Sequence, residues 1–152
     1  MSTIVGKISQ IVGPVIDVSY ADAEKLPNIM DSLEITKSNG QKVILECQQH
    51  IGEDAVRAIS MDATDGLSRG MEVVATGSPI LMPKGDQIRG RLFNVVGDAI
   101  DGIGDVPKAD GNPIHRKPPK FEVLSSSTVV LFTGIIVIDL IEPYSIGGNI
   151  GL

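Results

Sequence analysis

The stretch IVGKISQIVGPVIDVSY, Ile4 to Tyr20, indicates the fold at the start of the chain. It predicts a first strand over Ile4–Val12, a bend or bulge at Gly13-Pro14 and a second strand up to Tyr20. From Pro14 onward, apolar residues alternate with polar ones, apart from Val15, which is the period of a half-buried strand. Two short strands joined by a tight bend favour an antiparallel sheet.

The strand pattern continues to about residue 75. Leu33–Thr36 and Lys42–Gln49 flank Ser38-Asn39-Gly40-Gln41, and an Asn-Gly between alternating runs is a strong hairpin signal. In the second arm, Val43, Leu45 and Cys47 are predicted to point one way and Lys42, Glu46 and Gln48 the other, with Ile44 as the exception. Two more strands are predicted at Ala55–Met61 and Glu72–Ala75. Six short, evenly spaced strands favour a small closed barrel over a sandwich.

The character of the sequence changes after Pro79. Residues 80–83 predict an extended linker, Gly90–Gly102 a compact apolar segment, and Lys108–Lys120 an irregular surface excursion rich in proline. Near the C-terminus a helix is expected from about Ile135 to Glu142, capped by Thr133 and ended by Pro143. A further strand is expected to start at Asn149. We therefore expect a barrel domain at 1–79 and a second region at 80–152.

The net charge, the cysteine count and the distribution of apolar residues argue against several classes of function. The formal charge of −6 argues against a nucleic-acid partner, because phosphate binding needs a basic surface. Cys47 is the only cysteine, which excludes an internal disulfide and predicts a packed structural thiol. The longest uncharged window, Val123 to Ile138, is shorter than the ~20 apolar residues of a membrane span. The N-terminus has no apolar run of signal-peptide length.

The sequence offers no complete catalytic set. Asp98, Asp101 and Asp105 do not have the spacing of a calcium loop, and aspartate is common in tight turns. His50 and His115 are expected to be surface or capping residues. No Ser-His-Asp, Cys-His, paired-carboxylate or zinc pattern occurs. We therefore predict no catalytic, nucleotide-binding or metal-binding residue and no cofactor in these 152 residues.

Several landmarks, in order along the whole chain, resemble the N-terminal part of the beta subunits of the rotary F-type ATP synthases. They are Gly6–Tyr20, Leu45–Gly70, Thr76–Ile80, Gly90–Gly102 and Thr133–Tyr144. The second landmark distinguishes the catalytic beta type from the homologous non-catalytic alpha type. The resemblance implies a six-stranded barrel that joins alpha-subunit barrels in an alternating ring. It also implies that a P-loop nucleotide-binding domain begins near Ile80.

The same resemblance implies where the chemistry of the family lies. The phosphate loop, Gly-x-x-x-x-Gly-Lys-Ser/Thr, is expected to follow the strand that starts at Asn149, so this chain is expected to lack it. Mg-ATP or ADP, and the central rotor subunit, are implied for the full-length parent only. The resemblance implies that the protein lies on the cytoplasmic side of the energy-coupling membrane, as a peripheral subunit of a bacterial-type complex. A fragment that does not assemble is expected to be soluble.

Departures from the family pattern cluster after residue 122. Neutral residues replace the usual acids or lysines at Val123, Val129, Ile136, Ile146 and Asn149. Ile136 is expected to place an apolar side chain on a solvent-facing side of the helix. Two further hypotheses stay open: a free-standing small barrel that binds a partner, and a purely structural or competing role in the ring. Limited proteolysis of the chain is expected to leave a resistant piece that ends near residue 80.

Overall fold

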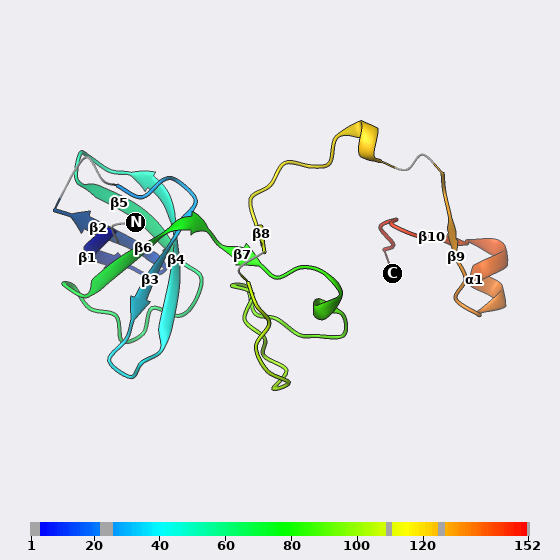
Figure 1. Ribbon diagram of the computed structural model, residues 1–152, viewed down its shortest axis with the longest axis horizontal. Helices are drawn as coiled ribbons and strands as arrows, with labels where there is room; N and C mark the ends of the chain where they lie inside the picture. Colours follow the sequence, from blue (N-terminus) through cyan, green and yellow to red (C-terminus); the bar gives the residue numbers. More distant parts are fainter. Residues whose placement is uncertain (1–3, 22–25, 109–110, 125–126, 152) are drawn as a thin grey trace. The chain divides into compact units, whose positions relative to one another are not determined.

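The computed structural model describes residues 4–21, 26–108, 111–124 and 127–151. It divides into two compact units, residues 1–116 and 117–152. The first contains the barrel strands β1 to β6, the short strands β7 and β8, and a 3-10 turn at Asp86–Ile88. The second contains a 3-10 turn at Phe121–Val123, helix α1 and the short strands β9 and β10 (Figure 1).

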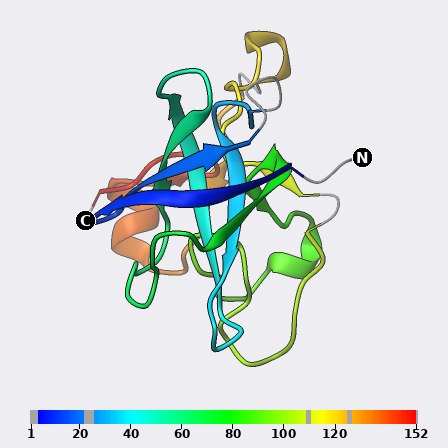
Figure 2. The same ribbon diagram turned by 90° about the vertical axis from the view of Figure 1, so that its left-hand side faces the viewer.

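Within the described residues, six strands form a closed barrel in the order β1-β2-β5-β4-β3-β6. Their bounds are Ile4–Val12, Val15–Tyr20, Asp31–Thr36, Lys42–His50, Ala55–Ser60 and Glu72–Pro79. Every neighbouring pair is antiparallel, and β6 closes the ring by pairing with both β1 and β3 (Figure 2). The predicted closed barrel is confirmed, including the hairpin between β3 and β4, where Gly40 adopts the positive φ that such a turn requires.

The barrel is filled by aliphatic side chains because alternate residues of each strand point inward. Ile16, Leu33, Ile35, Val43 and Leu45 are fully buried, and Tyr20 lies among them. The predicted inward set of β4 is confirmed, since Val43, Leu45 and Cys47 are all inaccessible to solvent. The predicted packed thiol is likewise confirmed; burial raises the pKa of Cys47 and makes it a poor nucleophile.

Residues 80–116 form one compact unit with the barrel. Strand β7, Leu81–Met82, pairs with β8, Asn112–Pro113, and Ile80 is buried beside them. Between these strands the chain makes a tight hairpin-like loop in which Phe93 bridges to Ala99. The predicted domain boundary at residue 80 stays a prediction, while the compact unit itself extends to Arg116.

The second unit differs from the prediction at two points. Helix α1 spans Ile136–Ile141 and ends before Pro143, but its N-cap residue is Ile135 and carries no side-chain cap. Thr133 instead donates its hydroxyl to Asp139, which also accepts the N–H groups of Thr133 and Gly134. These donors lower the pKa of Asp139. The predicted strand at Asn149 is absent from the described residues, whose last strand, β10, is Tyr144–Ser145 and pairs with β9, Val130–Leu131.

Candidate functional site

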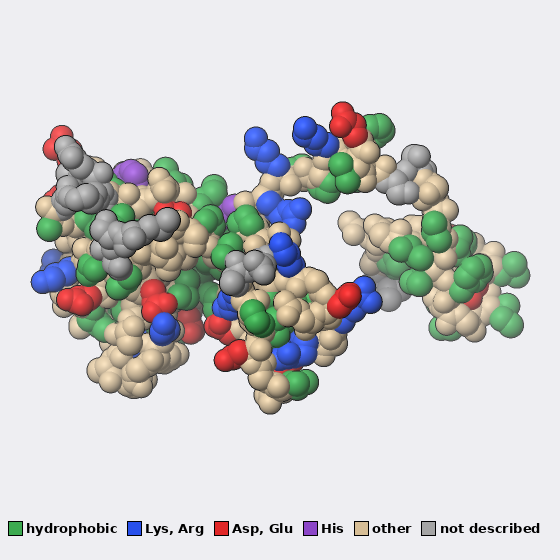
Figure 3. Space-filling view, in the orientation of Figure 1, with side chains coloured by type: hydrophobic (Ala, Val, Ile, Leu, Met, Phe, Trp, Pro, Cys, Tyr) green, Lys and Arg blue, Asp and Glu red, His purple; other side chains and the backbone are tan. Residues whose placement is uncertain are grey.

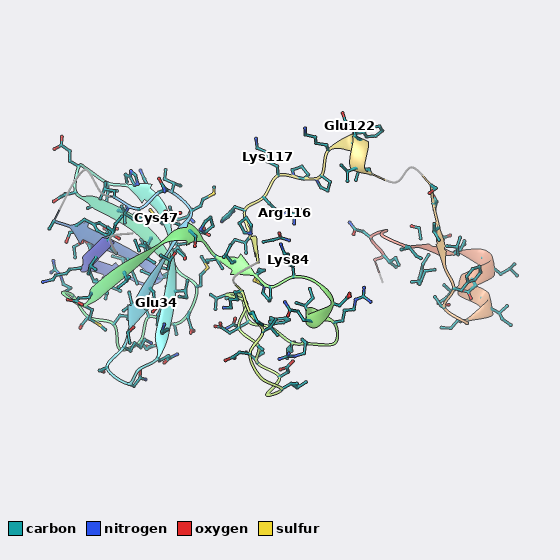
Figure 4. All side chains as sticks on the ribbon, viewed as in Figure 1. Glu34, Cys47, Lys84, Arg116, Lys117 and Glu122 are labelled. Carbon is teal, nitrogen blue, oxygen red and sulfur yellow. The ribbon has the colours of Figure 1, made fainter. Side chains whose placement is uncertain are left out.

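A cleft of about 650 Å³ lies between the outer face of the barrel and the segment that follows it. Its barrel side consists of outward residues of β3, β4 and β6, among them Glu34, Ile44 and Thr76 (Figure 4 labels Glu34). Its other side includes Phe93 and Val96 from the hairpin-like loop. This location explains Ile44, the apolar exception to the alternation of β4: its side chain lines the cleft and is half-buried there.

The cleft contains three carboxylates and two ammonium groups. Lys42 Nζ lies 2.8 Å from Glu34 Oε1, and this hydrogen bond raises the pKa of Lys42. Lys108 Nζ bonds Asp98 and also donates to the carbonyl of Val96 at 2.8 Å. Burial opposes ionisation of Asp98, but hydrogen bonds from Lys108 and Asn94 outweigh it and lower the pKa of Asp98. Each lysine is therefore ion-paired with a carboxylate of the cleft.

The fifth charged group is Asp62, in the turn after β5. Its Oδ1 accepts the backbone N–H of Ala63 at 2.7 Å. Within the part of the chain that the structure describes, no hydrogen bond reaches Asp62 Oδ2 or the second carboxylate oxygen of Glu34. The cleft thus presents unoccupied hydrogen-bond acceptors and a net charge of one negative unit.

Two polar networks hold the loop that forms the far wall. Asn94 Oδ1 accepts the N–H groups of Val96 and Asp98 at 3.1 and 2.8 Å. Arg91 makes a two-point ion pair with Asp101, at 2.5 and 3.0 Å. Arg91, together with the N–H groups of Ile103 and Leu92, lowers the pKa of Asp101. These bonds hold together the loop that forms this wall of the cleft.

A further contact fastens the segment to the barrel beside the cleft. Glu46 points outward from β4 as predicted, yet its side chain is only 4 % exposed. His115 Nε2 lies 2.7 Å from Glu46 Oε2, and Gln48 donates to Oε1. The carboxylate of Glu46 is buried because His115 covers it. His115 therefore holds the segment to the barrel through this contact with Glu46.

The other candidate residues have structural roles. His50 Nε2 lies 2.8 Å from the carbonyl oxygen of Pro27. Asp98 and Asp101 hold Lys108 and Arg91, which explains their occurrence in this loop. No group of three or more His, Cys, Asp or Glu residues is placed to hold a metal ion in the described ranges. The absence of catalytic, nucleotide-binding and cofactor-binding residues stays a prediction.

In the C-terminal unit, the five neutral residues that depart from the family pattern are exposed within the unit. Val123, Val129, Ile136 and Ile146 are 75, 54, 78 and 61 % exposed, and Asn149 is exposed as well. Figure 3 shows apolar side chains gathered over α1 in this unit. The expected solvent exposure of Ile136 is confirmed within the unit. No helix among the described residues is long and apolar enough to cross a membrane.

The sequence of the barrel matches one family model. Residues 8–77 match the model of the ATP synthase alpha/beta family, beta-barrel domain. The matched span runs from within β1 to within β6, and so includes β2 to β5 in full and parts of β1 and β6.

Proposed function

We propose that this chain, whose barrel matches the model of the ATP synthase alpha/beta family, beta-barrel domain, supplies the N-terminal part of a beta-type subunit of the F-type enzyme. The closed barrel matched at residues 8–77 carries the proposal. In this proposal the barrel takes a place beside alpha-type subunits in an alternating ring. The full-length parent makes ATP from ADP and phosphate, driven by a transmembrane proton gradient, and lies at the membrane as a peripheral subunit.

The beta-type assignment is supported by one segment of the barrel. Leu45–Gly70 has the beta-type pattern and covers the end of β4, all of β5 and the connection to β6. The family model covers both alpha and beta subunits, so the proposal that the chain is of the beta type rests on this segment.

We further propose that the phosphate loop of the parent lies outside these 152 residues, which contain no Gly-x-x-x-x-Gly-Lys-Ser/Thr sequence. Without the backbone cradle and the lysine, a nucleotide has no anion site. Titration of the chain with Mg-ATP is expected to give no binding in the micromolar range, and micromolar affinity would refute this point. Reading the DNA beyond the codon for Leu152 would reveal whether the loop continues in frame.

The decisive experiment for the ring role is assembly with alpha subunits. The chain is mixed with purified alpha subunits of an ATP synthase, and the products are resolved by native mass spectrometry. Mixed oligomers are expected. No mixed species at any ratio would contradict the proposal, provided that circular dichroism shows a folded barrel.

Outward apolar residues of the barrel offer a variant for this experiment. Val12 pairs with Val15 and Val15 with Ile59, which places the three side by side on the outer face of β1, β2 and β5. Val12 and Ile59 are 59 and 38 % exposed. The double variant Val12→Ser, Ile59→Ser is expected to weaken assembly without unfolding the core, whereas Thr36→Ser on another strand serves as the control.

A free-standing binding module is the second candidate, and the cleft is the observation that favours it. In that case the chain would bind a ligand but form no mixed oligomer with alpha subunits.

A further inference from the structure

We propose that the cleft beside the barrel is a binding site for a small organic cation with a flat apolar body, such as an aromatic amidinium or guanidinium. Its volume of about 650 Å³ lies within the ~300–1,000 Å³ range of small-molecule sites. Such sites also combine an apolar lining with a few polar groups, and they often occur where two parts of a fold meet. The site is independent of the proposed assembly function.

The apolar part of the ligand is set by the walls. Ile44 and Ile80 lie on the barrel side, and Phe93 and Val96 lie on the loop side. Ile44, Phe93 and Val96 are half-buried along the cleft, so a flat group placed between them would remove apolar surface from water on both faces. The ring of Phe93 can also attract a cation placed over its face.

The charge of the ligand is set by the acceptors. Lys42 and Lys108 are each ion-paired, with Glu34 and Asp98, so the charges within these two pairs cancel. Asp62 is the cleft carboxylate without a lysine partner among the described residues, and it gives the cleft its net negative charge. A planar cation with several N–H donors satisfies carboxylate oxygens, whereas an anion would meet a net negative charge.

The hydroxyl groups of the cleft do not change this preference. Ser32 Oγ and Thr76 Oγ1 lie 2.6 Å apart. Each also lies 3.0 Å from the carbonyl oxygen of Ser78, and Thr76 Oγ1 lies 2.9 Å from that of Ser32. Their protons are therefore committed to protein acceptors, which leaves them as weak donors for an incoming anion.

Three probes of nearly equal shape test the proposal. Benzamidinium, benzamide and benzoate carry a positive, a neutral and a negative group on the same ring. The ¹⁵N-labelled full chain is titrated with each, and amide shifts are followed by NMR. We expect saturable shifts at Thr76, Phe93 and Val96 with benzamidinium, at least threefold weaker binding of benzamide, and none of benzoate. Equal binding of all three, or shifts outside the cleft only, would overturn the proposal.

Matched variants locate the charge. Asp62→Asn is expected to weaken benzamidinium binding three- to tenfold, because it removes the unpaired carboxylate. Asp65→Asn, three residues further on and outside the lining, is expected to leave the affinity unchanged. Both side chains are exposed, so both variants are expected to fold, as their spectra will verify. Equal effects of the two variants would refute the role of Asp62.

Discussion

Gly6 is the residue at which the barrel has least room for a side chain. A Cβ on Gly6 would lie 2.7 Å from Val18 Cγ1, 2.8 Å from Tyr20 Cε1 and 2.9 Å from the carbonyl oxygen of Ser19. We predict that Gly6→Ala destabilises the barrel by about 1–3 kcal/mol, the usual cost of overpacking. Thermal unfolding measures the change. Gly151→Ala, where a Cβ would meet nothing, is the control, and an equal loss in both variants would contradict the prediction.

Asp17 and Arg57 form the two-point ion pair on the outside of the barrel, with N–O distances of 2.8 and 2.9 Å. The hydrogen bond from Arg57 lowers the pKa of Asp17. A lowered pKa means that the pair stabilises the fold above about pH 4, the range of an unfolded aspartate, and that this contribution is lost as the pH falls through the folded-state pKa.

Asp17→Asn is therefore predicted to lower the melting temperature at pH 7, and the difference from the unmodified chain is predicted to shrink below pH 4. Asp86→Asn removes an exposed pair with Arg89 and is predicted to change little at any pH, since exposed pairs contribute little. A difference for Asp17→Asn that grows on acidification would refute the sign of this argument.

At the scale of the element, the same truncation, leucine to alanine, is predicted to destabilise the barrel much more than helix α1. Leu33 is fully buried on β3, whereas Leu140 on α1 is 79 % exposed within its unit. Leu33→Ala is expected to cost about 2–5 kcal/mol through lost packing and a residual cavity. Leu140→Ala is expected to cost less than about 0.5 kcal/mol. Urea denaturation compares them; a large loss in Leu140→Ala would mean that α1 is covered by another surface.

The elements differ in how well the sequence predicts them. The bounds of β1 were predicted correctly, because Gly13-Pro14 ends the strand and the alternation resumes directly after it. The surroundings of Ile44 and Glu46 could not be predicted, because the surface that covers them comes from residues about 35 to 70 positions further along the chain. The alternation of residues within one strand contains no information about a contact with a distant part of the chain. The cleft was missed for the same reason, and Ile44 was its only signal.

The C-terminal elements were predicted less well. Thr133 is a residue type that often caps helices, but its hydroxyl donates to Asp139 and accepts the N–H of Ile135, which precedes the helix, and the helix itself begins at Ile136. The strand expected at Asn149 relied on an apolar pattern, and the described residues contain no partner strand for it. A strand needs a neighbour to satisfy its backbone groups, so propensity alone did not form one.

At the scale of the whole molecule, the division at residue 116 predicts the pattern of limited proteolysis. Trypsin is expected to cut first after Arg116 and Lys120, because both residues are exposed. Arg116 is the last residue of the first unit, and Lys120 lies in the second unit, in which little is buried. Lys84 and Arg89 are also exposed, but they lie in the unit held together by β7, β8 and His115.

Mass spectrometry of early digestion products tests this division. A stable fragment ending at residue 116 or 120 is expected. Early fragments ending at residue 84 or 89 would instead favour the sequence-based boundary near residue 80. His115→Ala is expected to expose the latter sites and provides a check that the contact with Glu46 holds the segment in place.

The pairing of β6 with both β1 and β3 has a consequence for synthesis on the ribosome. Until Glu72–Pro79 has left the exit tunnel, β1 and β3 of the nascent sheet are edge strands, each with one side unpaired. Each of them can pair with a strand of another chain. Ring closure is then a late, single event that joins the first-made part of the domain to the last. A chaperone that shields those edges would have its greatest effect on chains arrested just before residue 72.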